Sequence, residues 1–152
     1  MIKNEEAISI LNNLIEISKD GEEGVLKAAD SIDDSKLQAY LLRRSLEVKH
    51  SAIELQGLVR SLGGKPADSA SIGGYLHPRW VDLKAAILTN DKLTVRNEIE
   101  RGEDVALKTY RDATSRDLPS EAVLIVLRQL NGAQRNHDEV KQLRDAVELQ
   151  IH

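Results

Sequence analysis

The stretch that decides the fold of this chain is KPADSASIGGYLHPRWVDLKAAILTN, residues 65–90. Its first half is rich in Pro, Gly and Ser and has no helical periodicity, and only RWVDLKAAIL, residues 79–88, is typical of a short helix. On both sides of the stretch, apolar residues recur at the three-then-four spacing of an amphipathic helix. The stretch therefore predicts a long connection between two helical regions.

Two long helices are predicted before this connection. The first runs from about Glu5 to Ile32, with an apolar or small residue at every third or fourth position. Residues 33–35, Asp-Asp-Ser, supply a polar turn and an N-cap, and the second helix then runs to Gly63-Gly64. Because the turn is so short, the two helices are expected to be antiparallel neighbours.

Two more helices are predicted after the connection, from about Asp91 to Thr114 and from Ser120 to Glu148. They are separated by SRDLPSE, residues 115–121, so they too are expected to be antiparallel. Two helical hairpins joined by one long crossover predict an all-α fold, a ferritin-like four-helix bundle that spans residues 1–152 as a single domain. A bundle with one long loop and another arrangement is the main alternative.

The composition limits the possible partners. The chain has 41% hydrophobic residues but no Phe, so the core must be built from Leu, Ile, Val and Ala. A net charge of -4 gives no general attraction to nucleic acid or anionic lipid. Cysteine is absent, no stretch approaches the roughly 18 apolar residues of a membrane span, and the acidic N-terminus does not resemble an export signal. We therefore expect a cytoplasmic protein with no nucleic-acid or membrane partner.

Each long helix carries polar residues on its predicted core face, where a charge is costly unless it is paired, hydrogen-bonded or bound to a metal. In chain order these residues are Glu22; Arg44, Glu47 and Glu54; Arg96, Glu100 and Glu103; and Gln134, His137 and Arg144. Residues that lie equally far along the chain from a tight antiparallel turn should face each other. Measured from the first turn, this places Glu22 opposite Glu47, and measured from the second turn it places Glu100 opposite Gln134. The sequence therefore predicts a polar layer near the middle of the helices.

One interpretation of this layer is a metal site for iron or manganese. Glu47-Val-Lys-His50 has the Glu-x-x-His spacing that ferritin-like di-iron proteins use on two of their helices, while the other two helices each supply a Glu. The fourth helix offers Gln134-Arg-Asn-His137, with a neutral amide in place of the carboxylate, which argues against a standard oxidising di-iron centre. The candidate metal ligands are Glu22, Glu47, His50, Glu54, Glu100, Glu103 and His137.

The other interpretation is a salt-bridge layer that fixes helix register, in which these carboxylates pair with the arginines on the same core lines. Here His50 is an exposed surface residue, and His137 is a core histidine satisfied by a carboxylate such as Glu100. Interior glycines also fall at matching levels, and Gly102 and Gly132 predict a close approach between the third and fourth helices.

Four segments carry a family resemblance: DGEEG in the first helix, IELQGLVRSLGG in the second, EIERGEDVALKTY in the third and NHDEVKQLRD in the fourth. Together they resemble a bacterial family of uncharacterised ferritin-like four-helix-bundle proteins, filed as a domain of unknown function. The resemblance implies a bundle of two helical hairpins and no established activity. If the family has a site, Glu22, Glu54, Glu103 and His137 lie in the matching segments. The resemblance also implies that the position of Ser51 is commonly aromatic, so looser packing is expected at that level here.

Three hypotheses about function follow. The favoured one is a non-enzymatic bundle that self-associates as a homodimer, in a stress or housekeeping role. The alternative is a ferritin-like metal-binding protein that stores or oxidises iron or a similar ion. In the third, Tyr75 and Trp80 in the crossover bind a partner, although these residues are more typical of a cap on the end of the bundle.

Overall fold

The computed structural model describes residues 2–30, 32–68, 85, 88–89 and 92–151, and within these residues it contains helices and no strand. The four long helices are α1 (Ile2–Asp30), α2 (Ser35–Ser61), α4 (Lys92–Thr114) and α5 (Ser120–Ile151). Their bounds agree with the predicted helices to within a few residues. Of the predicted short helix at residues 79–88, only Ala85 and Leu88 are described, and both are helical. The Tyr75–Trp80 segment lies outside the described residues.

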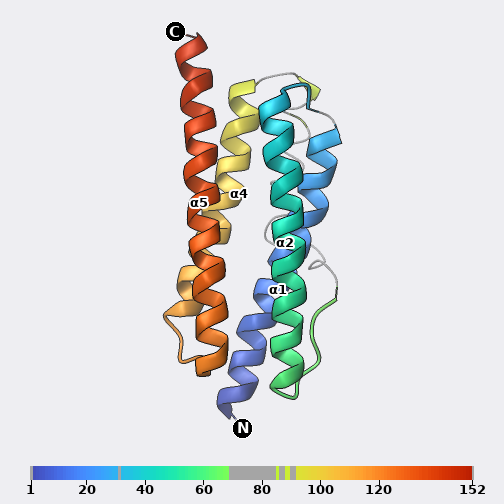
Figure 1. Cartoon of the computed structure of the whole chain (residues 1–152), viewed down its shortest axis with the longest axis vertical. Helices are drawn as coiled ribbons and strands as arrows, with labels where there is room; N and C mark the ends of the chain where they lie inside the picture. The colour runs from blue at the N-terminus through green and yellow to red at the C-terminus, as the bar shows by residue number, and fades with distance from the viewer. Residues whose placement is uncertain (1, 31, 69–84, 86–87, 90–91, 152) are drawn as a thin grey trace.

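The helices form two antiparallel hairpins, α1 with α2 and α4 with α5 (Figure 1). Figure 1 shows α2 ending near the N-terminus of the chain, whereas α4 begins at the opposite end of the molecule, beside the start of α2. The residues between α2 and α4 therefore link opposite ends of the structure, as the crossover prediction requires. Across the hairpins α1 contacts α4 and α2 contacts α5, more sparsely than within each hairpin. This places α2 and α4 on one diagonal of the bundle, running in the same direction.

The turn between α1 and α2 is fixed by Asp34. Its Oδ1 accepts hydrogen bonds from the backbone N–H groups of Lys36 at 2.9 Å and Leu37 at 3.1 Å, which caps the first turn of α2. Its Oδ2 accepts from the buried guanidinium of Arg96 on α4. The residue that caps one hairpin therefore also ties it to the other.

The end of α2 directs the chain into the crossover. Gly63 has φ 85°, and the N–H of Gly64 donates to the carbonyl of Val59 at 3.0 Å, so the helix stops in a left-handed cap. Residues 65–67 then lie against the first hairpin, because Asn12 of α1 donates to the Lys65 carbonyl at 3.1 Å and accepts from the Ala67 N–H at 2.8 Å.

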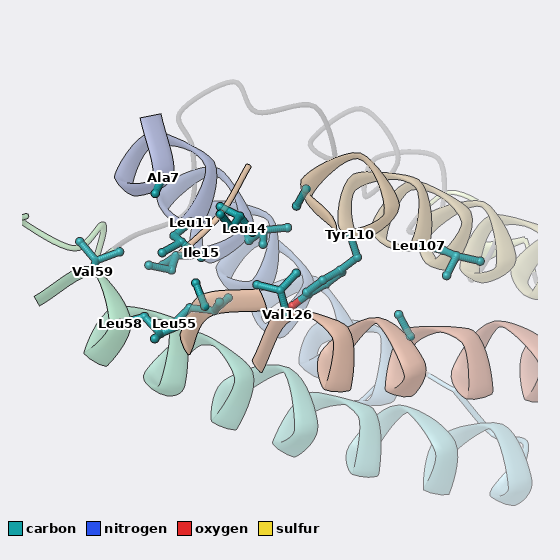
Figure 2. Packing of buried hydrophobic residues seen from close by; sticks show 14 residues of the cluster. Ala7, Leu11, Leu14, Ile15, Leu55, Leu58, Val59, Leu107, Tyr110 and Val126 are labelled. Carbon is teal, nitrogen blue, oxygen red and sulfur yellow. The ribbon is translucent and has the colours of Figure 1, made fainter. Parts of the chain in front are cut away.

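The buried apolar side chains form two separate clusters. Figure 2 shows the larger one, near the N-terminal end of α1, where Leu11 and Ile15 pack with Leu55 of α2, and Tyr110 of α4 with Val126 of α5. The smaller cluster surrounds the turn between α1 and α2. Its members are Ala28, Ala29, Leu37, Tyr40, Leu41, Val95, Ile99 and Val140. Between the clusters several buried residues are polar, namely Ser18, Arg44, Ser45, Glu103 and Asn136, beside the apolar Val48 and Ala52. The predicted mid-helix polar layer is therefore confirmed.

No helix in the described part of the chain is long and apolar enough to cross a membrane.

Replacing Asp34 separates its two roles. We expect Asp34→Ala to lower the free energy of unfolding by about 1–2 kcal/mol, because it removes the cap and the Arg96 contact together. Asp34→Asn keeps a capping oxygen and should cost less. Burial opposes ionisation of Asp34, but the Leu37 N–H and Arg96 outweigh it and lower the pKa of Asp34. A pKa that is lower in the folded state contributes stability above the unfolded value of about 3.9 and loses it as the pH falls through the folded value.

Urea unfolding of the wild type and both variants at neutral and acid pH measures this contribution. The gap between wild type and Asp34→Asn should narrow as the pH falls below about 4. Equal losses for Ala and Asn at neutral pH would contradict the capping role.

Candidate functional site

The centre of the polar layer is an ion pair between Arg44 of α2 and Glu103 of α4. The Arg44 Nε donates to both carboxylate oxygens, at 3.2 Å to Oε1 and 3.0 Å to Oε2. The hydroxyl of Tyr40, one turn before Arg44 on α2, donates to the same Oε2 at 2.8 Å. Because α2 and α4 are diagonal neighbours, these contacts pass through the middle of the bundle.

Both charged side chains are deeply buried, with 10% of Arg44 and 11% of Glu103 exposed. Burial alone would favour the neutral form of Arg44, but the Glu103 carboxylate outweighs it and the pKa of Arg44 is raised. Burial and the same carboxylate raise the pKa of Tyr40, so its hydroxyl keeps the proton that it donates. The carboxylate of Glu103 thus has a cation and a phenol as its partners.

Glu47 lies at the edge of this layer, between α2 and α5. It pairs with Arg43 Nε at 3.2 Å and, more distantly, with Arg44 at 3.7 Å. It also accepts a hydrogen bond of 2.8 Å from the buried Asn136 amide of α5. Arg43 in turn pairs with Glu139 of α5. The carboxylate of Glu47 therefore joins α2 to α5.

Glu54 belongs to a second series of hydrogen-bonded polar side chains, which lies closer to the larger apolar cluster. It pairs with Arg128 and accepts from the Gln129 amide at 2.8 Å, and Gln129 accepts from the Tyr110 hydroxyl at 2.7 Å. Burial would raise the pKa of Glu54, but the hydrogen bonds from Arg128 and Gln129 outweigh it and lower the pKa. Burial raises the pKa of Tyr110. This series of hydrogen bonds links α2, α5 and α4.

His137 pairs with Asp104, not with the predicted Glu100. Its Nε2 lies 2.5 Å from the Asp104 carboxylate and its Nδ1 lies 3.5 Å from Asp138. Side chains in a helix lean toward its N-terminus, so in an antiparallel pair the contacting residues are offset from their backbone levels. The same offset explains why Gln134 accepts from Arg111 at 2.8 Å, although its backbone is level with Glu100.

The remaining candidates lie apart from this layer. Glu22 is 3.9 Å from Lys19 on its own helix, Glu100 is partly exposed, and His50 is exposed on α2. Within the described residues no group of three or more His, Cys, Asp and Glu side chains is placed to hold a metal ion. The carboxylates of Glu47, Glu54 and Glu103 pair with arginines, as in the salt-bridge interpretation. Metal binding at the seven candidate residues stays a prediction.

The predicted close approach at Gly102 and Gly132 is wrong. A Cβ added to Gly102 would meet nothing within 4 Å, and one added to Gly132 would meet only the Arg135 side chain of its own helix, at 3.6 Å. The first hairpin is packed more closely at the corresponding place, because a Cβ on Gly21 of α1 would lie 3.9 Å from Val48 of α2. This contact agrees with the predicted alignment of α1 against α2. Gly102 instead borders an empty space.

That space is a cavity between the two apolar clusters, lined by residues from all four helices. Its volume is about 80 Å³. Small side chains on the wall do not fill this space, among them Ser18, Gly21, Ser51 and Gly102. Arg44 and the residues that hydrogen-bond with it form another part of the wall. Looser packing at Ser51 is what the family resemblance leads one to expect.

Sequence reasoning missed several residues of the site, including Tyr40, Asp104 and Gln129. The arginine partners Arg43 and Arg128 were missed because neither lies on the predicted core face of its helix. The cavity had a usable signal, because Ser18, Gly21, Ser51 and Gly102 place a small residue near mid-helix in three helices. Interpreting Gly102 as a close contact with Gly132 concealed it.

Breaking the central ion pair from one side should be severe. We expect Arg44→Met to lower the free energy of unfolding by about 3–5 kcal/mol, because it leaves the Glu103 charge buried without a cation. The double variant Arg44→Met/Glu103→Leu should cost much less than the sum of the two single changes. The control is Arg128→Met, which removes an arginine that is 64% exposed and should cost about 1 kcal/mol or less. Urea unfolding measures all four, and a loss for Arg44→Met no greater than for Arg128→Met would refute a structural role for the pair.

The comparisons with known proteins agree with the resemblance noted from the sequence. Residues 6–116, which run from the start of α1 through α4, match the family described as a domain of unknown function, DUF2383. No curated protein matches the chain. Because the match covers well over half of its length, the chain belongs to the DUF2383 family of uncharacterised domains.

Proposed function

We propose that this protein is a non-enzymatic, ferritin-like helical bundle that self-associates as a homodimer through the outer face of α2. The observation that carries the proposal is a row of large apolar side chains exposed on that face. The arrangement of the helices and the pairing of the buried carboxylates add support.

The ferritin-like assignment is supported by the path of the chain. Two antiparallel hairpins with a crossover between opposite ends of the bundle place α2 and α4 on one diagonal, in parallel, and every adjacent pair antiparallel (Figure 1). Ferritin-like bundles have one long crossover of this kind, whereas simple up-down-up-down bundles have none.

The exposed row on α2 consists of Leu42, Leu46 and Ile53, which are 46%, 61% and 53% exposed. At about 100° per residue these three side chains lie within roughly 40° of one another around the helix. Exposed apolar side chains gathered on one face are typical of a protein interface, whereas scattered ones are not. On α5, Leu124 and Leu127 are also exposed, at 72% and 40%.

A second copy of the chain is the partner that best suits this row. The row lies along one straight helix and can pair with itself around a two-fold axis, the commonest symmetry of soluble oligomers. An antiparallel pairing with the axis between Leu46 and Lys49 would bring Leu42 of one copy beside Ile53 of the other. Leu42 and Ile53 would then form apolar contacts on both sides of the axis, with Leu46 of each copy beside Lys49 of the other.

The non-enzymatic part of the proposal is supported by the carboxylates of the polar layer. Redox or hydrolytic chemistry in a bundle of this kind needs carboxylates that are free to bind metal. Here Glu103 is held by Arg44 and Tyr40, and Glu54 by Arg128. Metal binding is the alternative, and it would require these contacts to be exchanged for an ion.

Self-association is tested by placing a charge in the α2 row. We expect the wild type to sediment as a dimer and Leu42→Glu as a monomer of 16.9 kDa, because the pairing would place its carboxylate against the apolar Ile53 of the other copy. The matched control is Leu26→Glu, which charges an exposed leucine of α1 outside the row and should leave the dimer intact. Analytical ultracentrifugation provides the masses. A monomeric wild type at high protein concentration would refute the proposed dimer.

The metal alternative is tested with the ions alone. After anaerobic incubation with ferrous or manganous ion and desalting, we expect the wild type to retain much less than one ion per chain, because the buried carboxylates already have cationic partners. Elemental analysis measures the retained metal. Retention of one or two ions per chain, lost in Glu103→Gln, would instead establish the metal-binding alternative.

A further inference from the structure

The cavity in the polar layer contains a buried polar group whose hydrogen bonding is incomplete. Glu98 of α4 lines the cavity, and only 9% of its side chain is exposed. One of its carboxylate oxygens accepts from Arg101 at 2.9 Å, but the other, Oε2, is buried and has no hydrogen-bond partner. A buried carboxylate oxygen without a donor is costly, so this wall of the cavity favours a molecule that supplies one.

Three other polar groups on the cavity wall have partners within the protein. Arg44 and Tyr40 donate to Glu103, and Tyr110 donates to Gln129. Much of the remaining wall is apolar or carries small side chains, including Ile17, Gly21 and Ala106. Among the buried side-chain atoms described on this wall, only Oε2 of Glu98 lacks a hydrogen-bond partner.

The volume limits the size of an occupant. The cavity of about 80 Å³ far exceeds the roughly 10–15 Å³ that one water needs, and it is about half of the 150 Å³ engineered cavity that binds benzene. A molecule with a short branched hydrocarbon body fits this range. Glycine at position 102 keeps the space open, because no atom lies within 4 Å of where its Cβ would be.

The cavity adjoins a groove at the surface. A wide groove lies between α2 and α5, where these helices pack sparsely, and it shares Arg44, Ser51 and Gln129 with the cavity wall. The small Ser51 side chain lies on this common wall. Only side chains such as Ser51 and Gln129 therefore separate the cavity from the groove on this side.

We propose that this cavity is a binding site for a compact, mainly apolar molecule with one N–H or O–H donor, which hydrogen-bonds to Glu98. The apolar body of the ligand occupies the space beside Gly102 and Ser51. The cavity lies in the interior, whereas the Leu42, Leu46 and Ile53 row lies on the surface of α2, where Ile53 also borders the groove.

Four probes of one shape test the chemistry on the full-length protein: 2-methyl-1-propanol, isobutylamine, isobutyl chloride and isobutyrate. Their binding is followed by the amide resonances of Gly21 and Gly102, both of which line the cavity. We expect the alcohol or the amine to bind at least about tenfold more tightly than the chloride, which has no donor, and isobutyrate to bind weakest. Tighter binding of the amine would identify a cationic ligand, and tighter binding of the alcohol a neutral one.

Three variants locate the site. Glu98→Met removes the acceptor and should abolish the preference for the alcohol and the amine over the chloride. Gly102→Leu fills the space and should abolish binding of every probe. Its matched control is Gly57→Leu, which makes the same change at an exposed position of α2 away from the cavity and should bind as the wild type does. Leucine is a better helix former than glycine, so both leucine variants should melt at or above the wild-type temperature.

Three results would overturn the proposal. The first is no change of the two glycine resonances with any probe at tens of millimolar. The second is binding of the chloride by the wild type that is as tight as binding of both the alcohol and the amine. The third is unchanged binding by a folded Gly102→Leu variant.

Discussion

The ion pair between Arg44 and Glu103 is the contact on which the arrangement of the two hairpins depends. Within each hairpin a short turn and extensive contacts hold the helices together. Between the hairpins the contacts are fewer, and the central contact is a buried guanidinium held by a buried carboxylate across the diagonal. Such a pair tolerates little displacement, because moving either charge leaves the other unpaired in a medium that solvates it poorly. It therefore fixes how one hairpin is placed along the other.

The same pair explains why the core is divided. Charged and hydroxyl groups at mid-helix cannot pack as aliphatic side chains do, so the apolar residues gather in one cluster on each side of the polar layer. The small residues that flank the layer do not fill the space around it, and a cavity results. Close packing is the rule in protein interiors, so an interior space with an incompletely bonded carboxylate on its wall calls for an explanation. A bound molecule with a donor group provides one.

Much of this arrangement could be predicted from the sequence because it follows from local rules. The helix bounds followed from apolar spacing, the first turn from Asp34 as an N-cap, and the crossover from the loss of periodicity between Lys65 and Asn90. The polar layer was also predictable, since Arg44 and Glu103 lie on the core lines of their helices. A resemblance to a family of uncharacterised domains was predicted from four short segments, three of which lie within the residues that match the DUF2383 family.

The partners within the layer were predicted less well. His137 pairs with Asp104 and not with Glu100, because side chains lean toward the N-terminus of their own helix and shift contacts away from backbone levels. Arg43 and Arg128 reach Glu47 and Glu54 from off the core line with long side chains, so helix periodicity alone did not identify them. Gly102 borders open space and not a neighbouring helix.

The sequence by itself determined the all-helical class, the two hairpins, the crossover and the level of the polar layer, because periodicity, capping and turn length act over a few neighbouring residues. Only the tertiary structure decided which cation meets which carboxylate, which glycine faces a void and which leucines stay exposed. Those outcomes depend on the offset and separation of helices distant in sequence. A difference of one helical turn, about 5.4 Å, is enough to exchange one partner for another.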